Sequence, residues 1–253
     1  MEQGKIHTVI ENQVGWIKFF HPKSNSLPSV LLDEIARAIH LYDKDDSVKV
    51  IVLASEGEKA FCAGASFDEL LNITTKEQGK SFFSGFAKII LAMKESSKFV
   101  ITRVQGKAIG GGVGLVAASD YSFAVKSSSV KLSELSIGIG PFVIGPAVER
   151  KIGLAAFSEL SIDAESWRNA EWAHKNGLYT HLFDDETSMD TALNSLLSSL
   201  ANSSSEAMRK MKLMFWRGTS DWPVLLTERA ATSGDLVLSD QTKVLLLKFK
   251  EKK

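Results

Sequence analysis

The hydrophobic pattern at the start of the chain predicts two short strands, an amphipathic helix and a buried strand. Residues 7–11 and 15–20 read as short strands separated by a polar turn at 12–13. Apolar side chains then recur at near-helical spacing over 31–42, which predicts an amphipathic helix. Residues 48–54 are mostly apolar and β-branched, as expected of a strand buried on both faces.

The same order of elements returns in the middle of the chain. Residues 99–104 form another apolar strand, followed by a glycine cluster, an alanine-rich helix that ends near 119 and a strand over 121–125. Repeated units of two strands and a helix stack their apolar faces like the turns of a solenoid. Parallel strands joined by crossover helices also favour right-handed winding. We therefore expect an α/β fold built from ββα repeats.

The pattern changes from residue 155 onward to nearly continuous helical periodicity. Apolar positions at helical spacing include Leu193, Leu196, Leu197, Leu200, Met208, Met211, Phe215 and the run over 225–238. On this basis we divide the chain into a ββα core over 1–195 and a helical region over 196–253. The last helix is markedly apolar over 244–249, and such a face needs a partner. We expect part of this surface to form an oligomer contact.

Composition and charge are those of an ordinary globular protein. The chain has 253 residues, 44% of them hydrophobic, enough to bury one sizeable core. Thirty basic residues balance thirty acidic ones, so no long-range field attracts nucleic acid or an anionic membrane. The first eleven residues lack a signal peptide or membrane span, and the single cysteine, Cys62, suits a reducing compartment. We expect a cytoplasmic protein that binds neither nucleic acid nor membrane.

Three short segments carry residues suited to chemistry, and the first directly follows the buried strand. Small residues at Ala63, Gly64 and Ala65 would let a ligand approach the backbone closely. Ser66 or Asp68 could cap a following helix, whose first N–H groups would be free. A capped turn that only packs against the core has the same residue types.

The second segment is the glycine cluster, Gly110, Gly111 and Gly112, at the start of the alanine-rich helix. Glycine inside a helix is less favourable than alanine by about 1 kcal/mol, so something must compensate. Either the helix packs tightly on the sheet, or its backbone donors face an oxygen that becomes negative during a reaction. The spacing matches neither a dinucleotide fingerprint nor a P-loop, which disfavours a nucleotide site.

The third segment, over 130–142, holds a single carboxylate, Glu134, in apolar and small-residue surroundings. Burial would raise its pKa toward the range useful for proton transfer near neutral pH. An exposed glutamate at a strand end is the alternative. No metal site is expected, because the chain has one cysteine and no His-Glu-x-x-His motif.

In this order and at these separations, the three segments resemble the crotonase superfamily, the enoyl-CoA hydratase/isomerase family. The resemblance covers roughly 5–177 well and the C-terminal helices more loosely. Residues 61–65 resemble the family's first oxyanion segment, which implies a donor N–H at Ala65. Residues 108–112 resemble the second, which implies a donor N–H at Gly111. Two such donors would stabilise a thioester enolate, and losing one in comparable sites costs about 3–4 kcal/mol.

The resemblance implies a crotonase-like right-handed spiral of ββα repeats with a C-terminal helical trimerisation region. It implies a homotrimer, or a hexamer formed as a dimer of trimers. The substrate would be an acyl-CoA thioester, with coenzyme A part of the substrate and no separate cofactor. Beside Ala65, Gly111 and Glu134, the residues expected at the substrate or coenzyme A are Lys59, Ala60, Phe61, Ala63, Gly64, Ser66, Gly110 and Pro141, with Lys248, Phe249 and Lys250 as further candidates.

The catalytic carboxylates depart from those of the family's hydratases. There a glutamate three residues after the donor glycine pairs with one in the third segment, and here these positions hold Gly114 and Glu134. Hydration uses two carboxylates to hold and split a water, whereas moving a double bond needs one base. We therefore expect an enoyl-CoA isomerase with Glu134 as base. A hydratase and a non-catalytic acyl-CoA binder are the alternatives, and Asp68 or Glu69 could replace the missing acid.

Overall fold

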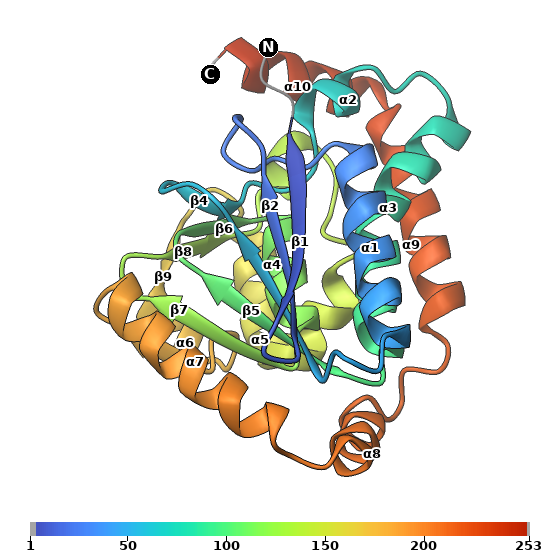
Figure 1. Cartoon of the computed structure of the whole chain (residues 1–253). Helices are drawn as coiled ribbons and strands as arrows, with labels where there is room; N and C mark the ends of the chain where they lie inside the picture. The colour runs from blue at the N-terminus through green and yellow to red at the C-terminus, as the bar shows by residue number, and fades with distance from the viewer. Residues whose placement is uncertain (1–3, 252–253) are drawn as a thin grey trace.

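The computed structural model describes residues 4–251, and within them the strands form a six-stranded and a four-stranded sheet flanked by helices (Figure 1). The larger sheet has the order β1 (Lys5–Glu11), β2 (Val14–Phe20), β3 (Val50–Ser55), β5 (Phe99–Val104), β7 (Tyr121–Val125) and β10 (His181–Phe183). The smaller sheet has the order β4 (Ala60–Cys62), β6 (Lys107–Ile109), β8 (Ser129–Lys131) and β9 (Arg168–Asn169).

Helices follow most of the strands and make up the C-terminal part. They are α1 (Ser29–Lys44), α2 (Phe67–Leu71), α3 (Lys76–Glu95), α4 (Gly111–Ala118), the 3-10 helix η1 (Leu135–Ile137), α5 (Gly145–Ile162), α6 (Ala170–Lys175), α7 (Glu186–Ala201), α8 (Ser205–Phe215), α9 (Trp222–Val237) and α10 (Asp240–Glu251). Among the described residues, no helix is both long and apolar enough to cross a membrane.

After β1, β2 and α1, three successive turns of the chain each add one strand to each sheet before a helix follows. Thus β3 and β4 precede α2 and α3, β5 and β6 precede α4, and β7 and β8 precede α5. The larger sheet is parallel from β2 to β10, as is the smaller one from β4 to β8. The predicted α/β fold of ββα repeats is therefore confirmed.

The strand β3 is buried on both faces, as its apolar sequence predicts. Ile51 and Leu53 belong to the main hydrophobic cluster, which includes the inner face of α1. Val50 and Val52 point to the other face, where they pack with Met189 and other residues of α7. Because strand side chains alternate, one run of β-branched residues joins two hydrophobic cores.

The prediction of nearly continuous helix after residue 155 is confirmed from Glu186 onward and is wrong over 163–185. Strands β9 and β10 interrupt the helices, and β10 extends the larger sheet by pairing in parallel with β7. Helix α5 itself is broken at Gly153, which has a φ of 76°. The boundary that we placed after residue 195 lies inside α7.

Helix α3 lies in a region to which the sequence analysis assigned no element. A capping box formed by Thr75 and Gln78 starts it, and its buried face repeats at helical spacing through Phe82, Phe86 and Ile90. Figure 1 shows α3 between α1 and α9, and both neighbours pack against it. This packing joins the C-terminal helix α9 to the rest of the fold through α3.

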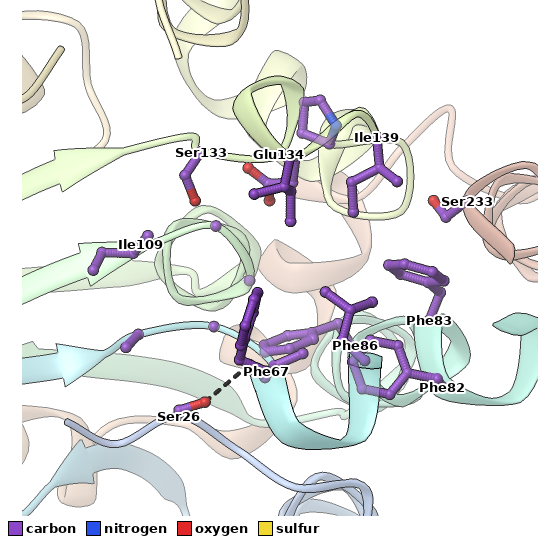
Figure 2. Close-up of a pocket in the computed structure, with 18 of the residues that line it drawn as sticks. Ser26, Phe67, Phe82, Phe83, Phe86, Ile109, Ser133, Glu134, Ile139 and Ser233 are labelled. Atoms are coloured by element: carbon purple, nitrogen blue, oxygen red, sulfur yellow. Dashed lines mark hydrogen bonds between the residues drawn. The ribbon is translucent and has the colours of Figure 1, made fainter. Parts of the chain in front are cut away.

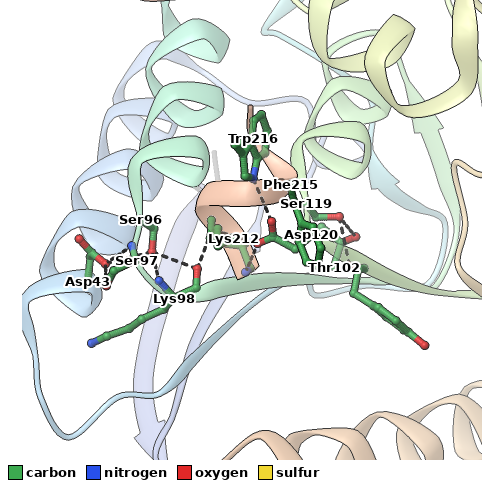
Figure 3. A network of polar contacts seen from close by, with 12 residues as sticks. Asp43, Ser96, Ser97, Lys98, Thr102, Ser119, Asp120, Lys212, Phe215 and Trp216 are labelled. Carbon is green, nitrogen blue, oxygen red and sulfur yellow. Dashed lines mark hydrogen bonds and ion pairs between the residues drawn. The ribbon is translucent and has the colours of Figure 1, made fainter. Parts of the chain in front are cut away.

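A buried polar network fixes α8 to the larger sheet (Figure 3). Nζ of Lys212 lies 2.9 Å from Oδ2 of Asp120, and the two side chains are 2% and 6% exposed. Asp120 also accepts hydrogen bonds from Nε1 of Trp216 at 3.0 Å and from the N–H of Val100 at 2.8 Å. Both charges are thus paired and hydrogen-bonded where water is excluded.

Candidate active site

The three segments singled out in the sequence meet around one cavity of about 680 Å³ (Figure 2). The loop before α2, the start of α4, the η1 region and helices α3, α9 and α10 supply its wall. Of the predicted site residues, those that line it are Ala63, Gly64, Ala65, Gly110, Gly111, Glu134, Pro141, Phe249 and Lys250.

Four other predicted residues of the first segment lie outside the cavity wall. Ala60 and Phe61 are buried in the protein, and Lys59 is exposed in the turn before β4. Ser66 accepts a hydrogen bond from the N–H of Glu69 and is the N-cap of α2, as its residue type predicts. Their contact with coenzyme A stays a prediction.

The first two segments approach each other through their backbones. Gly64 has a φ of 85°, and a Cβ atom there would lie 3.3 Å from the carbonyl oxygen of Ile109 and 3.6 Å from the nitrogen of Gly111. Leu27 holds the first segment by donating to the carbonyl of Gly64 and accepting from the N–H of Ser66. These contacts leave the intervening Ala65 in the cavity wall.

Among the lining residues 63–65 and 110–111, two backbone N–H groups have no acceptor within residues 4–251: those of Ala65 and Gly111. Both residues line the cavity. A buried N–H without an acceptor is uncommon, because leaving it unpaired is unfavourable. These two donors are therefore available to an oxygen atom of a bound molecule.

The glycine cluster is also required by packing. A Cβ atom on Gly112 would lie 2.4 Å from the carbonyl oxygen of Cys62, and one on Gly111 would lie 2.3 Å from the ring of Phe86. The backbone at Cys62 cannot move aside as a flexible side chain can. Tight packing, one of the two explanations offered above, thus accounts for Gly112.

The carboxyl group of Glu134 is buried beside the glycine cluster, not exposed at a strand end. Its Oε2 atom has no hydrogen-bond partner among the described residues. Burial raises the pKa of Glu134 from 4.5 to about 7, although the N–H groups of Glu134 and Ser133 lower it to a smaller extent. Near neutral pH this group can both accept and release a proton.

The position of the missing family acid is filled by another side chain. A Cβ atom on Gly114 would lie 2.4 Å from Cγ2 of Ile144, a residue that is 4% exposed and lines the cavity. The chain therefore has no room for a longer side chain at Gly114 unless Ile144 moves.

The other carboxylates near the cavity, Asp68 and Glu69, make contacts of their own. Asp68 forms an ion pair with Lys23 at the exposed rim of the cavity. Glu69 accepts hydrogen bonds from the N–H and Oγ of Ser29, at 3.0 and 2.6 Å. Burial raises the pKa of the Cys62 thiol to about 12, which excludes it as a base near neutral pH.

A family model described as enoyl-CoA hydratase/isomerase matches residues 9–253. The chain belongs to this family. It is 26% identical to the short-chain-enoyl-CoA hydratase of Clostridium acetobutylicum, over 100% of this chain and 97% of the relative. It is 30% identical to the mitochondrial enoyl-CoA hydratase of Pongo abelii, in a match that spans 72% of this chain and 62% of that relative.

Solved structures share the fold of this enoyl-CoA hydratase/isomerase family member. The crystal structure of enoyl-CoA hydratase from Bacillus halodurans superposes with a TM-score of 0.89 at 20% identity, over 96% of this chain and 99% of that chain. The predicted crotonase-like spiral is thus confirmed as the fold.

The family resemblance did not reveal most of the apolar cavity wall. The missed residues include Phe82, Phe83 and Phe86 of α3, Ile137, Ile139, Phe142, Val143 and Ile144 around η1 and α5, and Ser233 of α9. The helical spacing of the α3 phenylalanines was a usable signal for a helix. Their place at the cavity depends on how α3 packs and has no local signature.

Proposed function

We propose that this enzyme moves the double bond of an enoyl-CoA between the 3- and 2-positions, with Glu134 as its base. The observation that carries the proposal is that, in the part of the chain that the structure describes, a single buried carboxylate lines the cavity. Within the described residues, Glu134 and Asp68 are the carboxylates that line it, and Asp68 is exposed and paired with Lys23. A single buried base suits a proton shuttle better than the addition of water.

The thioester oxygen would lie between the N–H groups of Ala65 and Gly111. When a proton leaves C2, the C–H electron pair becomes the C1–C2 double bond of an enolate, and negative charge grows on this oxygen. Donors already fixed in place stabilise that charge without rearrangement. Removing either donor from comparable sites lowers the rate by about a hundred- to a thousandfold.

Glu134 would take a proton from C2 and give a proton to C4. The C3–C4 double bond supplies the electron pair of the new C4–H bond, the C1–C2 pair of the enolate becomes the C2–C3 double bond, and the thioester carbonyl re-forms. No atom is gained or lost overall. A carboxyl group with a pKa of about 7 is suited to both steps, because its two protonation states are close in free energy near neutral pH.

A hydratase is the second candidate, and the names of the relatives favour it. The relatives in Clostridium acetobutylicum and Pongo abelii are both called hydratases. In that case Glu134 would activate a water molecule without a second carboxylate at Gly114, where Ile144 fills the space. The two candidates differ in their products.

The test incubates the enzyme separately with 3-enoyl-CoA and 2-enoyl-CoA and follows the products by NMR in deuterated water. We expect 2-enoyl-CoA from the 3-enoyl substrate, and deuterium in the carbon chain. Glu134→Gln should lower turnover by at least about a hundredfold while acyl-CoA affinity is kept. The matched control is Glu149→Gln, at an exposed position on α5.

Three results would contradict the proposed function. Formation of 3-hydroxyacyl-CoA from 2-enoyl-CoA as the dominant reaction would support the hydratase. Unchanged turnover in Glu134→Gln would remove this residue from the mechanism, and no product from any thioester would support a binder without catalysis.

We also propose assembly as a homotrimer or hexamer through the helical region. Helix α8 supports this, because Leu213 and Met214 are 63% and 55% exposed and Phe215 is 41% exposed. Apolar side chains gathered on one surface mark contacts with other proteins. Analytical ultracentrifugation measures the state directly, and a monomer at all concentrations would contradict the proposal.

A further inference from the structure

The part of the cavity bounded by α3 is apolar. Phe82, Phe83 and Phe86 from α3 and Ile139 from the opposite wall surround it (Figure 2). The lysines among the described lining residues, Lys23 and Lys250, are exposed at the surface of the protein. An acyl chain that entered this part would therefore meet no cation to neutralise a carboxylate at its end.

Ser233 is the polar exception on this wall. It comes from α9, is 1% exposed and lines the cavity. Figure 2 shows its hydroxyl directed from the helix toward the cavity. Within residues 4–251, this hydroxyl has no hydrogen-bond partner. Hydroxyl groups in helices commonly donate to the carbonyl four residues earlier in the chain. The preceding residue, Thr232, does this, with its hydroxyl 3.1 Å from the carbonyl oxygen of Glu228.

The contact between α3 and α9 fixes Ser233 in this place. A Cβ atom on Gly79 would lie 2.6 Å from Cα of Gly234, and one on Gly234 would lie 2.6 Å from the nitrogen of Lys80. The two helices thus touch through their backbones at the residue next to Ser233. Because neither backbone can retreat, Ser233 stays beside the phenylalanines of α3.

We propose that Ser233 determines the acyl specificity of this enzyme by hydrogen bonding to an uncharged oxygen, a hydroxyl or oxo group, on the distal part of the acyl chain. The inference rests on the proposed function in one respect, that the cavity holds the acyl group of a coenzyme A thioester. A plain alkyl chain would displace water from Ser233 and leave a buried hydroxyl unpaired, whereas an oxygenated chain restores the hydrogen bond.

The test measures binding of saturated acyl-CoAs, from butanoyl to decanoyl, by calorimetry. Each is paired with the analogue that carries a terminal hydroxyl. We expect the hydroxylated chain to bind about tenfold more tightly at the length that reaches Ser233. Ser233→Ala should abolish this preference and keep affinity for the plain chain, and the control Thr232→Ala, on the exposed side of α9, should retain the preference.

Saturated acyl chains have no double bond to move, so they bind without turnover. Their binding therefore tests the role of Ser233 independently of the isomerase reaction. Tight binding of plain and hydroxylated chains with no preference at any length would overturn the role of Ser233 alone. The same preference in the wild type and Ser233→Ala would also overturn it. Failure of every acyl-CoA to bind would reject both this inference and the proposed function.

Discussion

The carboxylate of Glu134 lies directly against the backbone of Gly110: a Cβ atom on Gly110 would be 2.9 Å from Oε1 of Glu134. Gly110 also has a φ of 52°, which a side chain disfavours. Because residue 110 is a glycine, the carboxyl group of Glu134 in the third segment can contact the backbone of the glycine cluster.

Replacing Gly110 by alanine should displace the Glu134 carboxylate. We expect turnover to fall by about a hundredfold, because small misplacements of reacting groups have effects of this size. The matched control is Gly57→Ala, since Gly57 also has a positive φ, 92°, but a Cβ atom there would make only an ordinary contact, 3.7 Å from the ring of Phe20. Steady-state kinetics of both variants provide the measurement, and equal losses of turnover would show that backbone strain alone is responsible.

Alanine at Gly114 should destabilise the fold through Ile144. The added methyl group overpacks the contact between α4 and α5, which costs about 1–3 kcal/mol. Ile144→Ala alone should cost about 2–5 kcal/mol by leaving a cavity. In the double variant the smaller residue makes room for the added methyl group, so the loss should be less than the sum. Urea unfolding of the four proteins measures this coupling, and additive losses would disprove the contact.

The rate should depend on pH through the ionisation of Glu134. The base must be deprotonated, so kcat/KM for the isomerase should rise with pH, with a midpoint near its pKa of about 7, and level off above it. A pH profile of the wild-type enzyme measures this midpoint. A rate that stays constant down to about pH 5 would mean that the catalytic group is not this buried carboxyl.

Glu134→Gln should make the protein more stable at alkaline pH. The raised pKa means that the folded state holds a proton more tightly than the unfolded state, so Glu134 destabilises the fold increasingly as pH rises from 4.5 to about 7. A shift of this size corresponds to about 3 kcal/mol above pH 7. Denaturant unfolding should show the gain at about pH 8 and little gain at about pH 4, and a gain independent of pH would contradict this cause.

Lys212→Ala should be among the most destabilising single changes in α8. It leaves the buried Asp120 without its cation, a loss that costs about 3–5 kcal/mol in comparable buried pairs. Arg209→Ala on the same helix removes an exposed pair with Glu206 and should change stability little. Chemical denaturation compares the two variants, and similar small effects would show that the buried pair adds nothing.

Sequence alone identified much of the architecture, because each element has a local pattern. The strand β3 is a continuous apolar run, and α1 repeats its apolar residues at helical spacing. The three segments that meet at the cavity were also found in the sequence, since small residues and a lone carboxylate are visible without coordinates. The helix α3 also repeats its apolar residues at helical spacing, although we predicted no element there.

Tertiary structure decided which of these residues meet. Whether Glu134 is buried, which side chain fills the space at Gly114 and whether Ser233 reaches the cavity all depend on elements far apart in the chain. Hydrophobic periodicity fixes which face of a helix is buried but not which helix covers it. The pKa of Glu134 and the apolar wall opposite it follow from that packing, because burial is set by neighbours that no local sequence window contains.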